Sequence, residues 1–153
     1  MGSPVMTLDA ALVGVTHLGL DTAPLIYFIE RHPTYIERVR AVVQRIATGT
    51  LTGHTSVITL SEVLVKPLRL GQTALAQRYR RFLSHSRNLV LHTLDAAIAE
   101  RAAELRARYG LRTPDALQIA TALAAACTAL LTNDRQLQRV TDLRVLVLDE
   151  LEL

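Results

Sequence analysis

The segment LRTPDALQIATAL, from Leu111 to Leu123, carries a single carboxylate, Asp115, in a mostly apolar stretch. Thr113 is predicted to cap a helix through its hydroxyl, and Pro114 suits the first helical position, so Asp115 falls in the first helical turn. A negative charge there is stabilised by the helix dipole, by roughly 0.3 to 1 kcal/mol, without any function. The positions of the other acidic residues therefore decide whether Asp115 is a helix cap or part of a site.

The length and composition predict a single domain. The chain has 153 residues, and 50% of them are hydrophobic, which is enough for one buried core but too little for two domains. We expect a single domain over residues 1–153, in which the first five residues, beginning MGSP, are typical of a cloning remnant before a natural start at Met6. The only cysteine, Cys127, lies among alanines, which favours a core position and excludes an internal disulfide, zinc fingers and thiol catalysis.

Hydropathy gives no sign of a membrane protein. No apolar run reaches the roughly 18 residues that a membrane span needs. The N-terminus also lacks the charged start, apolar middle and cleavage site of a signal peptide. These patterns predict a cytoplasmic protein that does not bind a membrane.

The charge balance is compatible with a polyanionic partner. The net charge is +3, and all but one of the 17 basic residues are arginine, whose planar fork suits phosphate oxygens. The densest basic stretch, residues 77–87, reads QRYRRFLSHSR. In one interpretation Arg78 and Arg81 bind a phosphate backbone and the neighbouring aromatic rings stack on bases. In the other, the arginines face solvent and Tyr79 and Phe82 pack in the core.

Strands and helices alternate along the chain. Apolar residues at helical spacing predict helices at 7–15, 22–30, 35–46, 60–66, 72–84, 95–110 and 113–126, with Pro67 ending the fourth. Short apolar or β-branched runs predict strands at 17–21, 55–59, 88–94, 129–132 and 143–148. Continuous apolar strands separated by helices indicate an α/β fold with a parallel sheet covered on both faces.

Four of the 14 acidic residues share a position relative to the predicted strands. Asp21 and Asp134 each end a strand, Glu62 opens the helix after a strand, and Asp115 opens a buried helix. The carboxyl ends of parallel strands meet at one edge, where α/β proteins bind ligands. Converging carboxylates repel each other, and a hard divalent cation such as Mg²⁺ or Mn²⁺ removes that repulsion. The pattern therefore predicts a metal site at this edge.

The segments around these acids resemble the four motifs of PIN-domain proteins, close to the VapC-type toxins of toxin–antitoxin pairs. They are LDTAPLIYFIE, TSVITLSEVL, LRTPDALQIATAL and LLTNDRQL, which follow in family order between residues 18 and 137. The resemblance implies a three-layer α/β/α sandwich with a central parallel sheet of about five strands. It also implies an endoribonuclease that depends on Mg²⁺ or Mn²⁺.

The resemblance assigns roles to individual residues. Asp21, Glu62, Asp115 and Asp134 match the acidic quartet that is catalytic and binds metal. Thr22, Ser61 and Asn133 stand beside these acids and are expected to orient ligands or water. Arg112, with Arg78 and Arg81, is expected to bind phosphates of the RNA substrate. The expected protein partners are a cognate antitoxin and a second copy of the chain.

Several alternatives stay open or are disfavoured. A receiver domain needs a lysine at a strand end, but Lys66 lies within a predicted helix, and a haloacid-type phosphatase needs an aspartate at the position of Ala23. A housekeeping PIN nuclease that processes RNA remains open. A PIN fold that binds RNA or protein without cutting also remains open, although the intact quartet argues against it.

Overall fold

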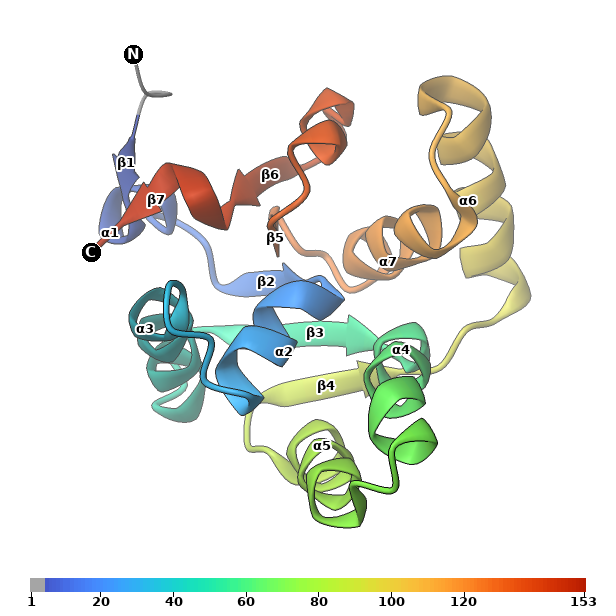
Figure 1. Ribbon diagram of the computed structural model, residues 1–153. Helices are drawn as coiled ribbons and strands as arrows, with labels where there is room; N and C mark the ends of the chain where they lie inside the picture. Colours follow the sequence, from blue (N-terminus) through green and yellow to red (C-terminus); the bar gives the residue numbers. More distant parts are fainter. Residues whose placement is uncertain (1–4) are drawn as a thin grey trace.

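A five-stranded parallel sheet forms the centre of the molecule (Figure 1), a computed structural model in which residues 5–153 are described. Its strand order is β4-β3-β2-β5-β6. The strands are β2 (His17–Leu20), β3 (Thr52–Ser56), β4 (Leu89–His92), β5 (Ala129–Thr132) and β6 (Arg144–Val147). The chain builds outward from β2 to β4 and then returns to add β5 on the other side of β2. The topological switch point, where α/β sheets bind ligands, therefore lies between β2 and β5.

Helices cover both faces of the sheet, as the α/β prediction requires. They are α2 (Thr22–Ile29), α3 (Ile36–Ala47), α4 (Val57–Arg69), α5 (Thr73–His85), α6 (Ala96–Tyr109) and α7 (Thr113–Ala124). Neighbouring residues of β5 show the two layers, because Leu130 packs with the cluster of α6 and α7 whereas Leu131 packs with α2, α3 and α5. The predicted three-layer α/β arrangement is confirmed.

Helix α7 packs directly on the centre of the sheet. A side chain at Gly19 of β2 would place its Cβ 2.8 Å from the Cβ of Ala122 in α7, so only glycine permits this approach. The helix begins one residue earlier than predicted for a Thr113 cap, because Arg112 is the N-cap residue and makes no capping bond with its side chain. Asp115 nevertheless lies in the first turn, as predicted.

The boundary between β3 and α4 differs from the prediction. Thr55–Thr59 was predicted as a strand, but the strand ends at Ser56, whose Oγ accepts a hydrogen bond of 3.1 Å from the backbone N–H of Ile58. This cap starts α4 at Val57, within the β-branched run. Glu62 consequently lies in the second turn of α4 and not at its start.

The prediction that Pro67 ends this helix is also wrong. Pro67 is buried inside α4, and the helix continues to Arg69. A proline removes only its own hydrogen bond to the preceding turn, so the residues after it can complete the last turn. Gly71, with φ of 67°, then reverses the chain toward α5.

The two chain ends form a small second sheet that the sequence did not predict. The helix expected at 7–15 is reduced to α1 (Leu8–Ala11), and β1 (Met6–Thr7) pairs in parallel with β7 (Leu151–Glu152). Two short 3-10 helices, η1 (Arg135–Arg139) and η2 (Leu148–Glu150), flank β6. Apart from Val5, the predicted cloning remnant lies outside the described residues.

The aromatic residues of α5 belong to the core. Tyr79 is 1% exposed, and Phe82 packs against the same hydrophobic cluster. The guanidinium of Arg78 donates a hydrogen bond of 2.6 Å to the carbonyl of Ile29. The core interpretation of this stretch is thus right, and stacking of bases on Tyr79 and Phe82 is wrong. Across residues 5–153, no helix combines the length and apolar character that a bilayer crossing requires.

Candidate active site

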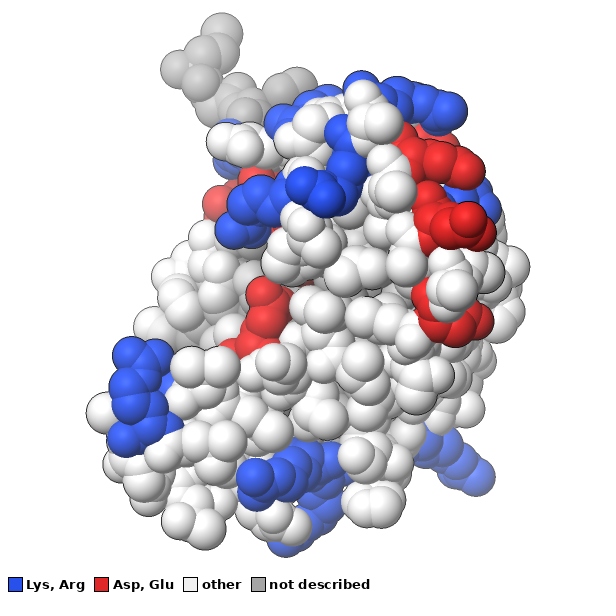
Figure 2. Space-filling view, turned by 90° about the vertical axis from the view of Figure 1, so that its right-hand side faces the viewer, with Lys and Arg blue, Asp and Glu red and all other residues white. Residues whose placement is uncertain are grey.

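The four acidic residues singled out in the sequence line one open cleft at the carboxyl ends of the strands. The cleft has a volume of about 400 Å³. It is lined by Asp21, Thr22, Ala23, Ile26, Tyr27, Glu62, Arg112, Asp115, Thr132, Asn133 and Asp134. Figure 2 views the molecule from this side and shows acidic side chains in a recess near the middle of the face, with basic side chains above and below. The cleft therefore lies at the predicted switch point.

Asp21 joins the end of β2 to the start of α2. One carboxylate oxygen accepts a hydrogen bond of 2.9 Å from the backbone N–H of Thr22 and so caps α2. The other oxygen accepts a hydrogen bond of 2.7 Å from the hydroxyl of Thr132, the last residue of β5. These two contacts fix the carboxylate between the two strands of the switch point.

Electrostatics connect Asp21 to the other acids. Burial raises the pKa of the Asp21 carboxyl, while the hydrogen bonds from Thr132 and Thr22 act in the opposite direction. The negative charges of Asp115 and Glu62 raise this pKa further. The negative charges of Asp115 and Glu62 therefore disfavour the ionised form of Asp21, which is the condition expected of a site that binds a cation.

Glu62 is held by the first turn of α2. The hydroxyl of Thr22 donates a hydrogen bond of 2.5 Å to its carboxylate. Thr22 also lies 3.1 Å from the hydroxyl of Thr59, which is buried one turn before Glu62 on α4. The predicted supporting residue Thr22 thus connects two of the acidic residues. Ser61, the other predicted support on α4, is exposed and lies outside the cleft lining.

A buried glutamine that the sequence analysis did not identify holds the helices together behind the cleft. The amide nitrogen of Gln118 in α7 donates to the hydroxyl of Thr59 at 2.6 Å, and its oxygen accepts from Ser56 at 2.7 Å. Gln118 is 5% exposed, so these bonds satisfy an amide that would otherwise be costly to bury. Its sequence signal was a glutamine within a buried apolar helix.

Asp115 is paired with an arginine at the rim of the cleft. The Nε of Arg112 donates to one carboxylate oxygen at 3.0 Å, and an Nη donates to the other at 3.4 Å. The side chain of Asp115 is 13% exposed and that of Arg112 is 77% exposed. The hydrogen bond and charge of Asp115 raise the pKa of Arg112, and Asp134 and Glu62 raise it further. Arg112 therefore offsets part of the negative charge of the cleft.

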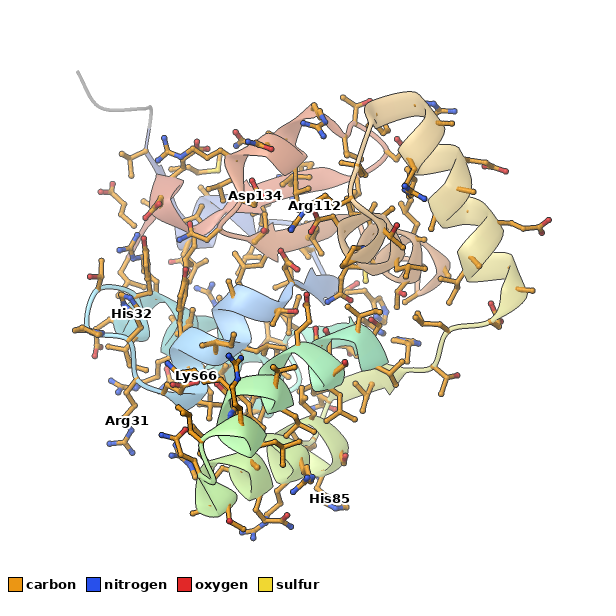
Figure 3. All side chains as sticks on the ribbon, turned by 45° about the vertical axis from the view of Figure 1, so that its right-hand side comes forward. Arg31, His32, Lys66, His85, Arg112 and Asp134 are labelled. Carbon is orange, nitrogen blue, oxygen red and sulfur yellow. The ribbon has the colours of Figure 1, made fainter. Side chains whose placement is uncertain are left out.

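Asp134 and Asn133 follow β5. A carboxylate oxygen of Asp134 accepts a hydrogen bond of 2.9 Å from the backbone N–H of Gln136 at the start of η1. The amide nitrogen of Asn133 lies 3.4 Å from the hydroxyl of Tyr27, which also lines the cleft. Figure 3 shows Asp134 and Arg112 near each other, with Lys66 of α4 and His85 of α5 lower in the view. Arg78 and Arg81 do not line the cleft.

The donor set fits a divalent cation in an open site. Among residues 5–153, no three His, Cys, Asp or Glu side chains lie close enough together to hold a metal ion. Each carboxylate instead faces a protein donor, as the contacts of Asp21, Glu62, Asp115 and Asp134 show. Mg²⁺ is typically bound by one or two carboxylates together with water and substrate phosphate. The carboxylate and hydroxyl oxygens of the open cleft suit that arrangement and do not form a closed cage.

Comparison with known proteins identifies the same fold and family. Residues 19–143 match the PIN domain family. No protein of curated function matches the sequence significantly.

Solved structures of similar fold come from toxin–antitoxin complexes. A toxin–antitoxin complex from Klebsiella pneumoniae contains a chain that is 25% identical, with a TM-score of 0.67, covering 87% of this chain and 98% of that one. A chain of VapBC2 from Rickettsia felis, bound to a promoter DNA fragment, is 22% identical with a TM-score of 0.67. The match covers 85% of this chain and 96% of that one. A chain of FitAB bound to an IR36 DNA fragment is 20% identical, with a TM-score of 0.70, and the match covers 90% of this chain and 99% of that one.

Proposed function

The chain belongs to the PIN domain family, and from this premise we propose that it is a metal-dependent endoribonuclease, the toxin of a toxin–antitoxin pair. PIN domains are nucleases, which supports a hydrolase that acts on nucleic acid. The observation that carries the proposal is the shared cleft of Asp21, Glu62, Asp115 and Asp134 at the switch point. The toxin assignment draws on the VapBC and FitAB complexes of similar fold. We also propose that the chain forms a single domain and acts in the cytoplasm.

Mg²⁺ or Mn²⁺ is proposed to bind among the four carboxylates, one or two of which would ligate the ion directly while the others would act through its bound water. A bound ion would supply a water of lowered pKa and would offset charge on the scissile phosphate. Thr132 and Thr22 orient the carboxylates of Asp21 and Glu62 through their hydroxyls. Arg112, exposed at the rim, can exchange Asp115 for a phosphate oxygen of the substrate, since both acceptors suit the guanidinium fork. An unpaired RNA strand can enter such a cleft more easily than a duplex.

A cleavage assay tests this function directly. Labelled single-stranded RNA is incubated with the protein in chelator, in Mg²⁺ and in Mn²⁺, beside a Glu62→Gln variant purified in the same way. We expect internal cleavage that needs the metal and is lost in the variant, because the amide keeps the size of the side chain but not its charge. RNA binding without cleavage would support the non-catalytic alternative. A contaminating nuclease would act equally in both preparations.

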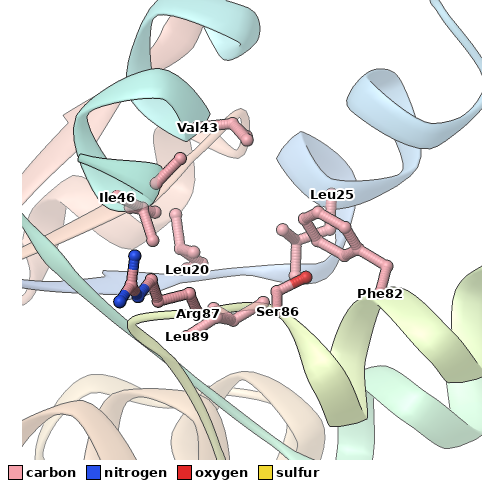
Figure 4. Close-up of a pocket in the computed structure, with 9 residues that line it drawn as sticks. Leu20, Leu25, Val43, Ile46, Phe82, Ser86, Arg87 and Leu89 are labelled. Atoms are coloured by element: carbon pink, nitrogen blue, oxygen red, sulfur yellow. The ribbon is translucent and has the colours of Figure 1, made fainter. Parts of the chain in front are cut away.

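We further propose that an antitoxin helix occupies the groove between α2, α3 and α5. An apolar pocket of about 180 Å³ opens there (Figure 4), lined chiefly by leucine, isoleucine, valine and phenylalanine side chains. A second pocket between the same helices is lined by Arg31, Arg40 and Arg78. Such a groove suits an amphipathic helix with apolar anchors and acidic residues. Unchanged nuclease activity in the presence of the cognate antitoxin would contradict inhibition through this groove.

A homodimer is the proposed form of the free protein. Support comes from Val65, Leu68 and Leu70 near the end of α4, whose exposed fractions are 51%, 58% and 58%. Exposed aliphatic residues grouped in this way are typical of a protein interface. Light scattering at high micromolar concentration should give twice the chain mass, and a monomer there would contradict the dimer.

A further inference from the structure

We infer that Tyr27, His32 and Tyr35 form a subsite that stacks on a nucleobase of the RNA beside the cleft. The inference rests on the proposed ribonuclease activity and adds a binding role for residues outside the acidic quartet. We call these three side chains the aromatic subsite. They lie at the end of α2, in the following turn, and just before α3. Figure 3 shows His32 in that turn, away from Arg112 and Asp134.

The aromatic subsite is a compact group of rings. Tyr27 and Tyr35 stack with their centroids 4.5 Å apart and their planes inclined by 17°. The ring of His32 lies 4.9 Å from both tyrosine rings and is tilted against each. All three residues are half-buried, whereas Tyr79, the tyrosine of α5, is 1% exposed. Both tyrosine rings pack on one side against the hydrophobic core, and each leaves part of its surface open to solvent.

The acidic cleft and the aromatic subsite are continuous. Tyr27 lines the cleft, and the amide nitrogen of Asn133 lies 3.4 Å from its hydroxyl. The backbone N–H of Asp149 donates to the oxygen of Asn133 at 3.0 Å, and the hydroxyl of Tyr35 donates to the Asp149 carboxylate at 2.6 Å. Asn133, beside Asp134, therefore ties the rings to the edge of the sheet. A nucleotide next to a phosphate in the cleft would meet these rings.

The charge around the aromatic subsite is mixed, because Arg31 follows the exposed Glu30 and Tyr35 contacts the Asp149 carboxylate. The cleft contains four carboxylates and repels a polyanion, so affinity must come largely from its surroundings. Arg38 stacks on Tyr35 at 5.0 Å and is held by the carbonyls of Thr34 and Leu148, which keeps the ring in place. The exposed Arg31 adds positive charge in the same turn. Aromatic stacking with any base then supplies attraction that does not depend on base identity.

The alternative occupant is the antitoxin, because the turn between α2 and α3 also borders the arginine-lined pocket. The aromatic subsite differs from that pocket in one respect: Tyr27 lines the acidic cleft, whereas the residues of the pocket do not. We therefore assign the rings to RNA, and binding of antitoxin becomes an outcome of the test.

The test compares Tyr27→Leu and Tyr35→Leu with a matched control, Tyr109→Leu. Tyr109 also donates its hydroxyl to an aspartate, Asp142, at 2.6 Å, and also lies beneath an arginine, but it does not line the cleft. Steady-state cleavage is measured on a short RNA with one cut site. The same RNA is then made with an abasic nucleotide on either side of the cut. Thermal melts and Tyr27→Phe, which keeps the ring, control for folding and for loss of the hydroxyl.

We expect both leucine variants to raise KM by roughly five- to a hundredfold, while Tyr109→Leu stays near the wild type and Tyr27→Phe, which keeps the ring, raises KM less than Tyr27→Leu does. An abasic nucleotide should raise the wild-type KM by a similar factor and add nothing in Tyr27→Leu, because the lost partner is the same. A structural role for the rings would leave the abasic penalty equal in both proteins.

The outcomes separate this inference from the proposed function. Cleavage with unchanged KM in the leucine variants, or an abasic penalty that persists in them, would overturn the aromatic subsite and leave the nuclease intact. Weakened antitoxin binding with unchanged KM would assign the rings to the antitoxin. A wild-type protein that cleaves no RNA would overturn the proposed function and the subsite together.

Discussion

Titratable side chains gather in two regions of the same sheet, the acidic cleft at its carboxyl edge and a row of histidines across β2, β3 and β4. In the row, Nδ1 of His17 lies 2.9 Å from Nε2 of His54, and Nδ1 of His54 lies 2.9 Å from Nε2 of His92. The cleft collects like charges in an open recess. The row collects rings that satisfy one another in hydrogen bonds across neighbouring strands.

The difference shows how to tell a site from a structural network. His54 is 7% exposed, and burial, together with His92 and His17, lowers its pKa to about 4, so the central ring of the row is uncharged at neutral pH. Every carboxylate of the cleft faces a protein donor yet remains beside solvent, and the pKa of Asp21 is raised by its neighbours as well as by burial. Like charges gathered in an open cleft indicate a ligand, whereas a closed hydrogen-bonded network indicates a role in stability.

The largest expected effect is on catalysis in the cleft. Asp21→Asn should lower the rate of RNA cleavage by more than about a hundredfold, because the amide cannot supply the charge that a cation needs. The amide oxygen can still accept from Thr132, so the thermal midpoint should stay near that of the wild type. Cleavage at the wild-type rate would remove Asp21 from the site.

The histidine row should show the opposite behaviour. His54→Ala should destabilise the fold by about 3 kcal/mol, because it leaves a cavity and removes the partner of two ring nitrogens. Chemical unfolding measures the loss, and His85→Ala, on an exposed histidine of α5, is the matched control. We expect the folded His54 variant to cleave RNA normally. A selective loss of activity without loss of stability would show that the row belongs to the site.

Acidification should sharpen the same contrast. The pKa of His54 in the folded protein, about 4, lies below its ordinary value of 6.5, so the unfolded chain binds more protons between these pH values. The contribution of neutral His54 to the free energy of unfolding is complete above pH 6.5 and is lost as the pH falls toward 4. It amounts to at most about 3 kcal/mol. Urea unfolding at pH 7.5, 5.5 and 4.5 measures it. His54→Ala should have a flatter pH profile than the wild type, and equal profiles would contradict the assignment.

The contrast also explains what the sequence could predict. Apolar periodicity indicated the five strands and most helices. Two acids at strand ends and two near helix starts indicated one edge, because parallel topology brings such positions together. The run Thr55–Thr59 misled, since its β-branched residues suit a strand, while a local cap at Ser56 starts a helix there. The pairing of β1 with β7 depends on contact between the two chain ends, which no local pattern encodes.

Side-chain networks were the least predictable part. Gln118 is visibly out of place in an apolar helix, but its partners Ser56 and Thr59 come from other elements and follow only from packing. The three histidines lie far apart in the sequence and meet only through strand register. Tyr27 has no sequence signal for a place in the cleft, because an aromatic residue on an amphipathic helix normally indicates the core.

The smallest expected effect concerns Asp115, where a helix-cap role and a metal-binding role predict different responses to Asp115→Asn and to added Mn²⁺. As a dipole residue, Asp115→Asn should cost up to about 1 kcal/mol without metal, and Mn²⁺ should stabilise both proteins equally. As one of four like charges, its loss relieves repulsion, but it also removes the pair with Arg112, so the variant in chelator should melt within a degree or two of the wild type. Mn²⁺ at a hundred times its dissociation constant should then stabilise the wild type by about 2.7 kcal/mol and the variant clearly less. Melts in chelator and in Mn²⁺ distinguish the two roles, and equal metal shifts with a lower midpoint in chelator would leave Asp115 as a helix cap.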